Sequence, residues 1–329
     1  MKVVITGGGG FIGMRIAKAL LARGTLSDGG ESRDQQQPIA RITLLDTGFA
    51  PSLPSDPRLE IVKADIADPA VIERVVTPDT ASIFHLAAVV SGGAESDFDL
   101  GMRVNLDALR LLLERARRAV RPPRVVFASS VAAFGGELPA VLDDSITPNP
   151  QTSYGMQKVV SEYLLTDYSR KGFIDGRSLR LPTIVVRPGK PNLAASSFAS
   201  AIFREPLNGV PCDCPVGAET GIWMLSPRRV VEAFIHAHEL PAEAWGTRRV
   251  VNLPGITVSI RDGLDALARV AGPQVASRVA WKPEARIQAI VKTWPVNFST
   301  PRALALGFRA DPDVETIIRD YIADEGIRV

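Results

Sequence analysis

The stretch KVVITGGGGFIG, residues 2–13, decides the fold, because a strand-like apolar run passes directly into a cluster of glycines. Gly8, Gly10 and Gly13 match G-x-G-x-x-G, while Gly7, Gly10 and Gly13 match G-x-x-G-x-x-G, and a helix-like run follows. Glycines in such a turn let the backbone approach a pyrophosphate, whose charge the helix N-terminus stabilises. A tight turn needs glycine for steric reasons alone, but this context favours a dinucleotide site. Its predicted contacts are Gly7, Gly10, Phe11, Ile12 and Gly13.

Five more strand-like runs follow the first at intervals that leave room for helices. They are RITLLD (41–46), LEIVKAD (59–65), SIFHLAAVV (82–90), RVVFASS (124–130) and SLRLPTIVV (178–186). Strands rich in Val and Ile that alternate with helices indicate a parallel sheet covered on both faces. We therefore predict a doubly wound α/β (Rossmann) fold. We expect a dinucleotide-binding domain over 1–190 and a smaller α/β region over 191–329 that mainly binds a second ligand, with segments such as 226–255 returning to the sheet domain.

Two further segments carry structural predictions. Residues 24–41, GTLSDGGESRDQQQPIAR, are polar and predict a mobile surface insertion before the second strand. Residues 311–325 predict a closing helix with Asp311 as its cap and Pro312 in its first turn. The expected apolar face of this helix consists of Val314, Ile317, Ile318, Tyr321 and Ile322.

Composition excludes several classes of function. The chain has 329 residues, and its 38 basic side chains nearly balance 36 acidic ones, so the basic surface of a nucleic-acid binder is missing. Cys212 and Cys214 are the only cysteines, too few for a structural zinc or a disulfide framework, and no metal site is predicted. No apolar run reaches about 18 residues and no leader-like segment follows Met1. We predict a cytoplasmic protein with a small-molecule partner and no membrane contact.

Asp46 ends the second strand, where a carboxylate accepts hydrogen bonds from ribose hydroxyls and repels a 2′-phosphate. It lies 33 residues after Gly13, farther than the usual ~20, and the polar insertion accounts for the difference. The pattern favours NAD over NADP, although Asp46 could instead begin a turn. His85 is interpreted as a packed core residue. Further predicted cofactor contacts are Asp65 and Ile66 at the adenine, the strand-end residues Leu86, Ala87 and Ala88, and Pro182 at the nicotinamide.

The segment SYGMQK places Tyr154 and Lys158 four residues apart, on one face of a helix. A nearby ammonium favours the phenolate, so we expect Lys158 to lower the pKa of Tyr154 and make it a general base. Ser130 ends a strand at the edge where ligands bind in open α/β folds, and Asn105 is placed to anchor a water that links Lys158 to solvent. Tyrosine and lysine at this spacing also occur by chance. Together with the glycine turn, Asp46 and the strand-end serine, they indicate a catalytic site.

The motifs TGGGGFIG, HLAA, SSVAAFGG and YGMQK, with Asn105, resemble the extended short-chain dehydrogenase/reductases, the NAD-dependent epimerase/dehydratase family, over roughly two thirds of the chain. The resemblance implies that Ser130 is the catalytic hydroxyl, Tyr154 the base and Asn105 the proton-relay asparagine. It also implies that Lys158 holds the nicotinamide ribose and that the protein is a homodimer. Phe134 stands where many epimerases carry a tyrosine, which weakens the case for a nucleotide-sugar epimerase.

Segments around AAVVSGGAESDFDLGMRVN, IVVRPGKPNLAASSF and MLSPRRVVEAF resemble, within this family, NAD-dependent dehydrogenases that oxidise C2 of a four-carbon sugar acid, D-erythronate, to a 2-oxo acid. Arginine or lysine suits a carboxylate, and hydroxyl side chains suit the substrate hydroxyls. Arg228 and Arg229 compete for the carboxylate. The predicted substrate contacts are Ser91, Ser130, Tyr154, Thr183, Arg187, Lys190, Asn192 and Ser197, with Gly92 and Ser196 beside them.

Other functions stay open on the sequence. A nucleotide-sugar 4-epimerase or dehydratase, or a uronate dehydrogenase, would carry the same catalytic residues. A non-catalytic NAD(P)-sensing regulator would be expected to have lost Tyr154 or Lys158, and this chain keeps both. A plain interaction scaffold would have no reason to combine Ser130 with them.

Overall fold

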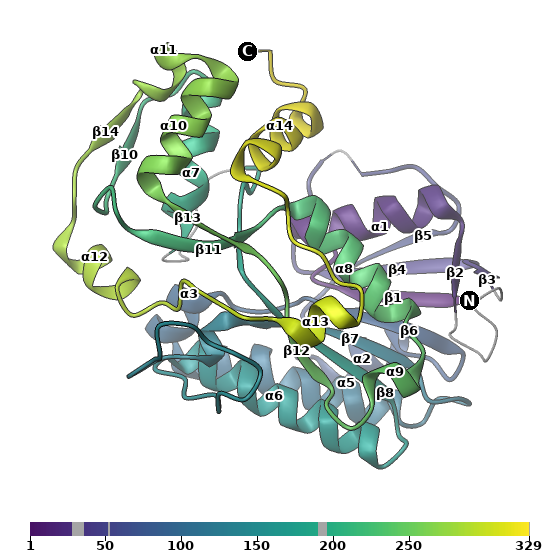
Figure 1. The fold of residues 1–329 in the computed structure, drawn as a ribbon. Helices are drawn as coiled ribbons and strands as arrows, with labels where there is room; N and C mark the ends of the chain where they lie inside the picture. The colour runs from purple at the N-terminus through teal and green to yellow at the C-terminus, as the bar shows by residue number, and fades with distance from the viewer. Residues whose placement is uncertain (28–35, 52, 190–195, 329) are drawn as a thin grey trace.

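The computed structural model describes residues 1–27, 36–51, 53–189 and 196–328. Seven parallel strands form one sheet in the order β12-β8-β7-β6-β1-β4-β5. Helices lie on both faces of this sheet (Figure 1), so the predicted doubly wound α/β fold is confirmed. The strands are β1 (Lys2–Thr6), β4 (Arg41–Asp46), β5 (Leu59–Lys63), β6 (Thr80–His85), β7 (Arg124–Ser130), β8 (Asp175–Leu181) and β12 (Val250–Asn252).

Two separate apolar layers hold the helices on the sheet. On one face, α1 (Phe11–Arg23) and α8 (Pro227–Glu239) pack side chains such as Leu20 and Phe234 onto the strands. On the other, α2 (Pro69–Val75), α5 (Ala108–Ala116) and α6 (Ser153–Arg170) contribute a second buried cluster. Full burial of each large apolar side chain stabilises the fold by about 1.5–3 kcal/mol. The sheet is therefore rigid where its strand ends carry functional groups.

Most residues after β8 build a smaller unit with its own core. Its centre is a three-stranded sheet, β13-β11-β9, beside a strand pair, β10-β14. Figure 1 shows this unit above the carboxyl ends of the large sheet. Its elements are β9 (Thr183–Ile184), α7 (Ser197–Leu207), β10 (Cys212–Cys214), β11 (Gly221–Leu225), β13 (Ile256–Ser259), α10 (Ile260–Ala271), α11 (Pro273–Ala276), β14 (Val279–Trp281), α12 (Ala285–Val291) and α14 (Val314–Glu325).

Short elements complete the described chain. They are the hairpin strands β2 (Thr25–Ser27) and β3 (Gln36–Pro38), α3 (Ser91–Ser96), α4 (Phe98–Gly101), a π-helical segment (Met102–Asp107), a 3₁₀ turn (Val131–Ala133), α9 (Ala242–Trp245) and α13 (Pro301–Ala305). The predicted mobile insertion thus begins and ends in a hairpin, and its centre, 28–35, lies outside the described residues. No helix in the described ranges combines the length and apolarity needed to span a membrane.

Three predicted strands differ from the structure. Residues 178–186 do not form one strand, because Pro182 lacks the N–H needed to continue the ladder. β8 ends at Leu181, and β9 pairs with β11 of the smaller unit. The run 82–90 leaves the sheet after His85, and 59–65 leaves it after Lys63. These early endings turn the following residues toward the edge where a ligand binds.

The closing helix α14 has the predicted apolar face but a different cap. Asp313 is the N-cap, and its Oδ1 accepts a hydrogen bond of 2.7 Å from the Thr316 amide. Asp311 is buried and instead accepts hydrogen bonds from the amide and hydroxyl of Ser226. The prediction of Asp311 as cap was wrong because Asp311 fixes the start of α8. Of the predicted apolar face, Val314, Ile317, Ile318 and Tyr321 are buried, and Ile322 packs against them.

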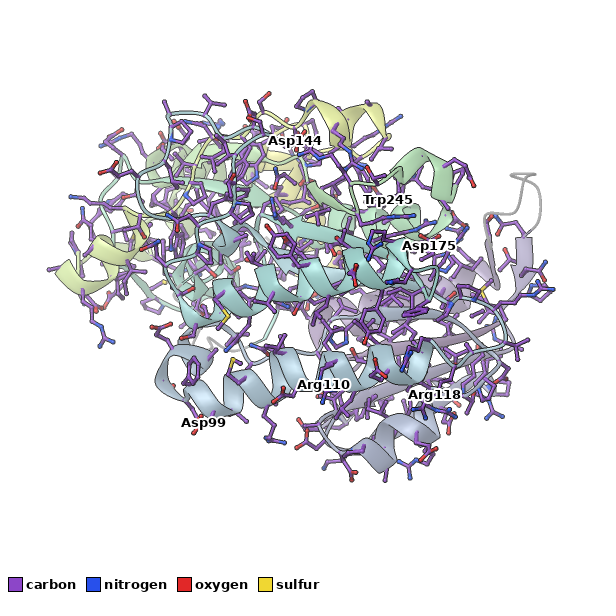
Figure 2. The ribbon with its side chains drawn as sticks, turned by 90° about the horizontal axis from the view of Figure 1, so that it is seen from below. Asp99, Arg110, Arg118, Asp144, Asp175 and Trp245 are labelled. Carbon is purple, nitrogen blue, oxygen red and sulfur yellow. The ribbon has the colours of Figure 1, made fainter. Side chains whose placement is uncertain are left out.

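Buried arginines hold the far end of α8. Arg124 and Arg177 both donate 2.7 Å hydrogen bonds to the His238 carbonyl, and Asp175 pairs with both guanidinium groups. Figure 2 shows Asp175 and Trp245 close together at this end of the sheet, and the Arg177 guanidinium lies 5.8 Å from the Trp245 ring centroid. Cations at a helix C-terminus satisfy its last carbonyls and its dipole, so this cluster is structural.

Candidate active site

A cavity of about 510 Å³ lies at the carboxyl ends of β6, β7 and β8, between the sheet and the smaller unit. Open α/β folds bind ligands at this edge. Of the catalytic residues predicted from sequence, Ser130 and Tyr154 line the cavity. Phe11 and Ile12, which begin α1, also reach it and connect it to the glycine turn.

The glycines of the first turn have two different roles. Gly7 has φ +70°, and a Cβ there would lie 2.7 Å from the Ala87 nitrogen. A Cβ at Gly13 would lie 2.3 Å from the Gly7 carbonyl oxygen. Gly10 is exposed, and its nearest contact would be a milder 3.2 Å. Steric packing therefore explains why Gly7 and Gly13 are glycines. Gly10 instead leaves open space at the start of α1. Because this helix start has no side-chain cap, its free amides suit a pyrophosphate.

Asp46 joins the end of β4 to the glycine turn. Its Oδ2 accepts a hydrogen bond of 3.0 Å from the Gly9 amide, and its Oδ1 accepts one of 3.2 Å from the Gly48 amide. A carboxylate offers about four lone-pair sites, so the half-buried Asp46 can still accept two ribose hydroxyls. The turn and ribose interpretations of Asp46 are thus compatible.

The predicted adenine contacts have mixed surroundings. Asp65 accepts hydrogen bonds from the Arg103 guanidinium at 2.6 Å and from the Ala67 amide at 2.9 Å, which lower the pKa of its carboxyl. Ile66 is buried in the core beneath the sheet. Leu86, Ala87 and Ala88 are half-buried directly after β6. Contact of Asp65 and Ile66 with the adenine, and of Leu86, Ala87 and Ala88 with the cofactor, stays a prediction.

Tyr154 and Lys158 lie on one face of α6, as their spacing predicts. Thr152 caps this helix, since its Oγ1 accepts the Gly155 amide at 3.1 Å. The Tyr154 hydroxyl hydrogen-bonds Ser130. Lys158 is buried, its Nζ donates to the Ala128 carbonyl at 2.7 Å, and it lies 5.4 Å from the Tyr154 ring centroid. The helix therefore places a phenol and an ammonium beside the Ser130 hydroxyl at the end of β7.

The expected effect of Lys158 on Tyr154 was wrong for this structure. Burial raises the pKa of Tyr154 to about 12, and the cation that opposes this rise is Arg187. Burial also lowers the pKa of Lys158 to about 7, against the attraction of Glu162. Desolvation outweighs the neighbouring charges here, because the Lys158 ammonium faces the Ala128 carbonyl and the Phe127 ring.

Asn105 lies within the π-helical segment, an irregularity frequent at functional sites. Its Oδ1 accepts from the Val89 amide at 2.7 Å, and its Nδ2 donates to the Val89 carbonyl and to Gln157 Oε1. Through these bonds Asn105 connects the segment after β6 with Gln157 of α6, the residue before Lys158. The predicted relay role of Asn105 stays a prediction.

Arg187 is the distinctive cation of the cavity. Its Nη2 donates to the Ser196 carbonyl at 2.9 Å and to the Ser196 hydroxyl at 3.1 Å. No carboxylate pairs with it in the part of the chain that the structure describes, although Arg204 donates to its carbonyl oxygen at 2.9 Å. Burial and the Arg204 charge lower the pKa of Arg187, but arginine stays protonated. This half-buried cation faces the cavity without a counter-ion.

The other predicted substrate residues divide into three groups. Ser91, Gly92, Thr183 and Ser196 line the cavity with Arg187, as does Pro182, which was predicted to contact the nicotinamide. Ser197, the first residue of α7, is not among the lining residues. Lys190 and Asn192 lie outside the described residues.

Several lining residues were missed by sequence reasoning. They come from segments far apart in the chain: Glu95, Trp223, Ile290, Trp294, Pro295 and Val296. Trp223 lies on β11 and stacks on Phe298 at 5.2 Å. No local motif signals these positions: Glu95 lies on α3, after β6, and the fold of the smaller unit brings the other five residues to the sheet edge.

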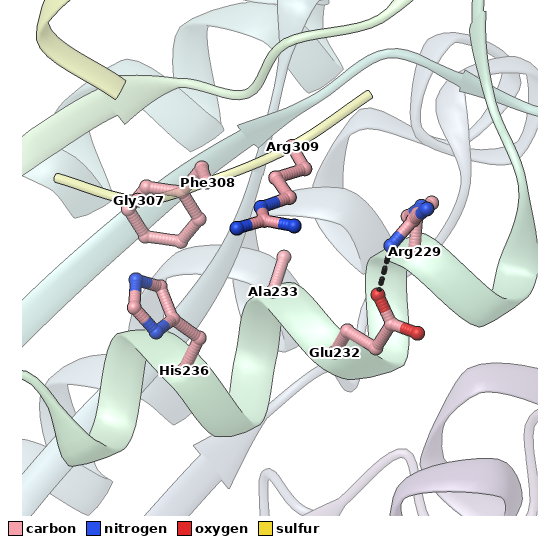
Figure 3. A pocket seen from close by; sticks show the side chains of 7 residues that line it. All are labelled: Arg229, Glu232, Ala233, His236, Gly307, Phe308 and Arg309. Atoms are coloured by element: carbon pink, nitrogen blue, oxygen red, sulfur yellow. Dashed lines mark hydrogen bonds and ion pairs between the residues drawn. The ribbon is translucent and has the colours of Figure 1, made fainter. Parts of the chain in front are cut away.

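Arg228 and Arg229, the predicted competitors for the carboxylate, lie elsewhere. Arg228 pairs with Asp320 and Asp324 of α14. Arg229 pairs with Glu232 at 2.7 Å in a separate cavity of about 270 Å³ along α8 (Figure 3). Neither arginine lines the cavity that holds Tyr154.

Comparisons with known proteins place this geometry in context. Residues 3–242 match the model of the NAD dependent epimerase/dehydratase family. The chain is 56% identical to D-erythronate dehydrogenase of Cupriavidus necator, with 99% of each chain covered. It is 42% identical to D-erythronate dehydrogenase of Haemophilus influenzae, with 98% and 99% covered. Among solved structures, a nucleoside-diphosphate-sugar epimerase from Agrobacterium tumefaciens has a TM-score of 0.91 at 40% identity, with 99% and 94% covered.

Proposed function

The chain belongs to the NAD-dependent epimerase/dehydratase family, and we propose that it is an NAD-dependent dehydrogenase that oxidises the C2 hydroxyl of D-erythronate to 2-oxo-tetronate. The two relatives named D-erythronate dehydrogenase match over nearly the whole chain. The single structural observation that carries the proposal is Arg187, which pairs with no carboxylate among the described residues and lies in the cavity that Tyr154 and Ser130 line. A buried charge is costly when unpaired, and a substrate carboxylate would complete this site.

The chain's own residues supply positioning and proton transfer. Arg187 binds the carboxylate, so that the adjacent C2 hydroxyl lies against Tyr154 and Ser130. Tyr154, as the phenolate, accepts the proton of that hydroxyl, and Ser130 donates a hydrogen bond to the same oxygen as charge develops. Thr183, Ser91 and Ser196 remain as partners for the other hydroxyls. We extend the same proposal to Lys190, Asn192 and Ser197 as secondary contacts.

The glycine turn and strand ends fit the cofactor. Gly10 leaves open space at an uncapped helix start, and Asp46 keeps acceptor sites for the adenosine ribose. When bound, NAD supplies a hydride-accepting carbon and a positive ring charge, which favours the Tyr154 phenolate. Lys158 would hold the nicotinamide ribose. Because the Asp46 carboxylate repels a 2′-phosphate, we propose NAD over NADP.

A nucleotide-sugar epimerase is the second candidate, favoured by the 40% identity to the Agrobacterium protein. Two observations support the dehydrogenase instead. Phe134 lines the cavity where many epimerases carry a tyrosine. Arg187 favours a carboxylate near Tyr154, whereas a nucleotide sugar offers its charge at a distant diphosphate.

The predicted homodimer is supported by exposed apolar side chains on the helical face away from the active site. Phe98 on α4 is 51% exposed and Tyr163 on α6 is 64% exposed. Figure 2 shows Asp99, Arg110 and Arg118 along the neighbouring helical run, beside α6. We propose that this face pairs with a second copy, which light scattering of the purified protein tests. A cytoplasmic location stays a prediction.

The function is tested with purified protein, NAD and a panel of C4 to C6 aldonates, uronates and UDP-sugars. We expect growth of the NADH absorbance band with D-erythronate at a kcat/KM at least about tenfold above that of any other acid. Repeating the assay with NADP tests the cofactor preference. Epimerisation of a UDP-sugar without net NADH formation would contradict the proposal and favour the epimerase.

A further inference from the structure

We propose that Glu162 is a positioning residue of the active site, which keeps the Lys158 ammonium charged and fixes the end of β7. The inference deepens the proposed function and rests on it. Tyr154, Lys158 and Glu162 are spaced four residues apart, so they lie in a row along one face of α6. Glu162 is only 3% exposed, and sequence motifs do not single it out.

The contacts of Glu162 connect it to the strand that carries Ser130. The Ser129 hydroxyl donates to Oε1, and Arg180 donates to Oε1 at 2.9 Å and to Oε2 at 2.6 Å. Ser129 stands between Ala128, whose carbonyl accepts the Lys158 ammonium, and Ser130. One carboxylate therefore fixes the backbone segment that holds both the lysine and the catalytic hydroxyl.

The groups around Lys158 leave Glu162 as its counter-charge. β6 contributes His85, which burial keeps neutral by lowering its pKa to about 3. β7 contributes the Phe127 ring, 4.6 Å from Nζ, and the Ala128 carbonyl. α6 contributes Tyr154 and Glu162. Among the described residues that face Lys158, Glu162 is thus the only carboxylate, and its attraction opposes the burial that lowers the pKa of Lys158 to about 7.

The contacts of Arg180 show why the Glu162 carboxylate stays in place. Arg180, on β8, lies 4.8 Å above the Phe134 ring centroid, and its Nη1 donates to Asn252 Oδ1 of β12 at 3.4 Å. A carboxylate held by a bidentate arginine is fixed in orientation. Glu162 is therefore shared between a structural cation, Arg180, and a functional one, Lys158. Removal of Glu162 should make Lys158 easier to deprotonate, and removal of Arg180 should make it harder to deprotonate.

The test compares Glu162→Gln and Arg180→Gln with the control Asp167→Asn, an exposed acid on α6. In protein labelled with ¹³C at lysine Cε, the Lys158 resonance, assigned through Lys158→Met, is titrated without cofactor or substrate. We expect the Lys158 titration to move about one pH unit downward in Glu162→Gln and upward in Arg180→Gln, with no change in Asp167→Asn. The alkaline limb of kcat/KM for D-erythronate should move in the same directions.

The outcomes separate the two proposals. Absent or same-direction NMR shifts in the two variants overturn the role of Glu162, whatever the activity. If the wild type oxidises no sugar acid, the proposed function fails, while the NMR arm still tests Glu162. Glu162→Asp, which keeps the charge, should return the titration toward wild type. If Glu162→Gln does not fold, Arg180→Gln decides alone, and a downward or absent shift there contradicts the inference.

Discussion

The cavity at the sheet edge and the cavity on α8 are both lined by arginines, but Arg187 of the first and Arg229 of the second differ in their partners. Arg187 has hydrogen bonds to Ser196 but no carboxylate partner in the described chain. Arg229 is paired with Glu232 and lies 4.0 Å from Asp311, and Figure 3 shows this pairing within its cavity. From this difference in pairing we expect Arg187, rather than Arg229, to bind a substrate carboxylate.

The largest expected difference between the two cavities comes from Tyr154→Phe. Loss of the general base should reduce kcat for D-erythronate by about 10²–10⁴-fold, while NAD affinity, measured by calorimetry, stays close to wild type. The matched change His236→Phe in the α8 cavity should leave kcat within about twofold. An active Tyr154→Phe enzyme would remove the catalytic role from this cavity.

Arg187→Met tests the comparison directly. A charge-assisted hydrogen bond contributes about 1.5–3 kcal/mol, so KM for the acid should rise about 10- to 100-fold. A decrease in kcat is also expected, because Arg187 opposes the rise in the pKa of Tyr154. NAD affinity should not change. Arg229→Met is the control, and an equal rise in KM for both variants would contradict the distinction drawn between the cavities.

The sequence predicted the local parts of this arrangement and missed the distant ones. The glycine turn and the pair Tyr154 and Lys158 depend on short spacing, and Asp46 ends a recognisable strand. The structure joins Asp46 to the glycine turn and places Lys158 near Tyr154. The sequence could not show that burial dominates the pKa of Tyr154, or that Trp223 and Trp294 close the cavity, because both depend on packing between distant segments. Pro182 was visible in the sequence, but its effect on strand pairing was not recognised.

Asp46→Asn is expected to have a smaller effect, confined to the cofactor side of the large cavity. One hydrogen bond to a backbone amide and the negative charge are lost, so NAD affinity should fall about tenfold and the preference over NADP should narrow. Calorimetry with both cofactors measures this. KM for D-erythronate at saturating NAD serves as the internal control. An unchanged NAD to NADP ratio would show that Asp46 only shapes the turn.

The smallest effect concerns stability, whose dependence on pH should differ between Lys158, beside the large cavity, and Arg229 in the cavity on α8. Burial lowers the pKa of Lys158 from 10.5 to about 7, so the unfolded chain binds this proton more tightly than the folded one between those values. Linkage then requires the contribution of Lys158 to stability to rise with pH across that window and to be lowest below pH 7. Relative to wild type, the Tm of Lys158→Met should therefore rise by several degrees as the pH is lowered from 10 to 7.

Arg229→Met is the matched control for this stability experiment. It removes a partly exposed ion pair, which contributes about 0–1 kcal/mol, and its Tm difference from wild type should stay constant over the same pH range. A pH-independent difference for Lys158→Met would mean that Lys158 keeps its ordinary pKa. Burial of the charged Lys158 side chain would then cost no stability, and the ammonium would need no support from Glu162.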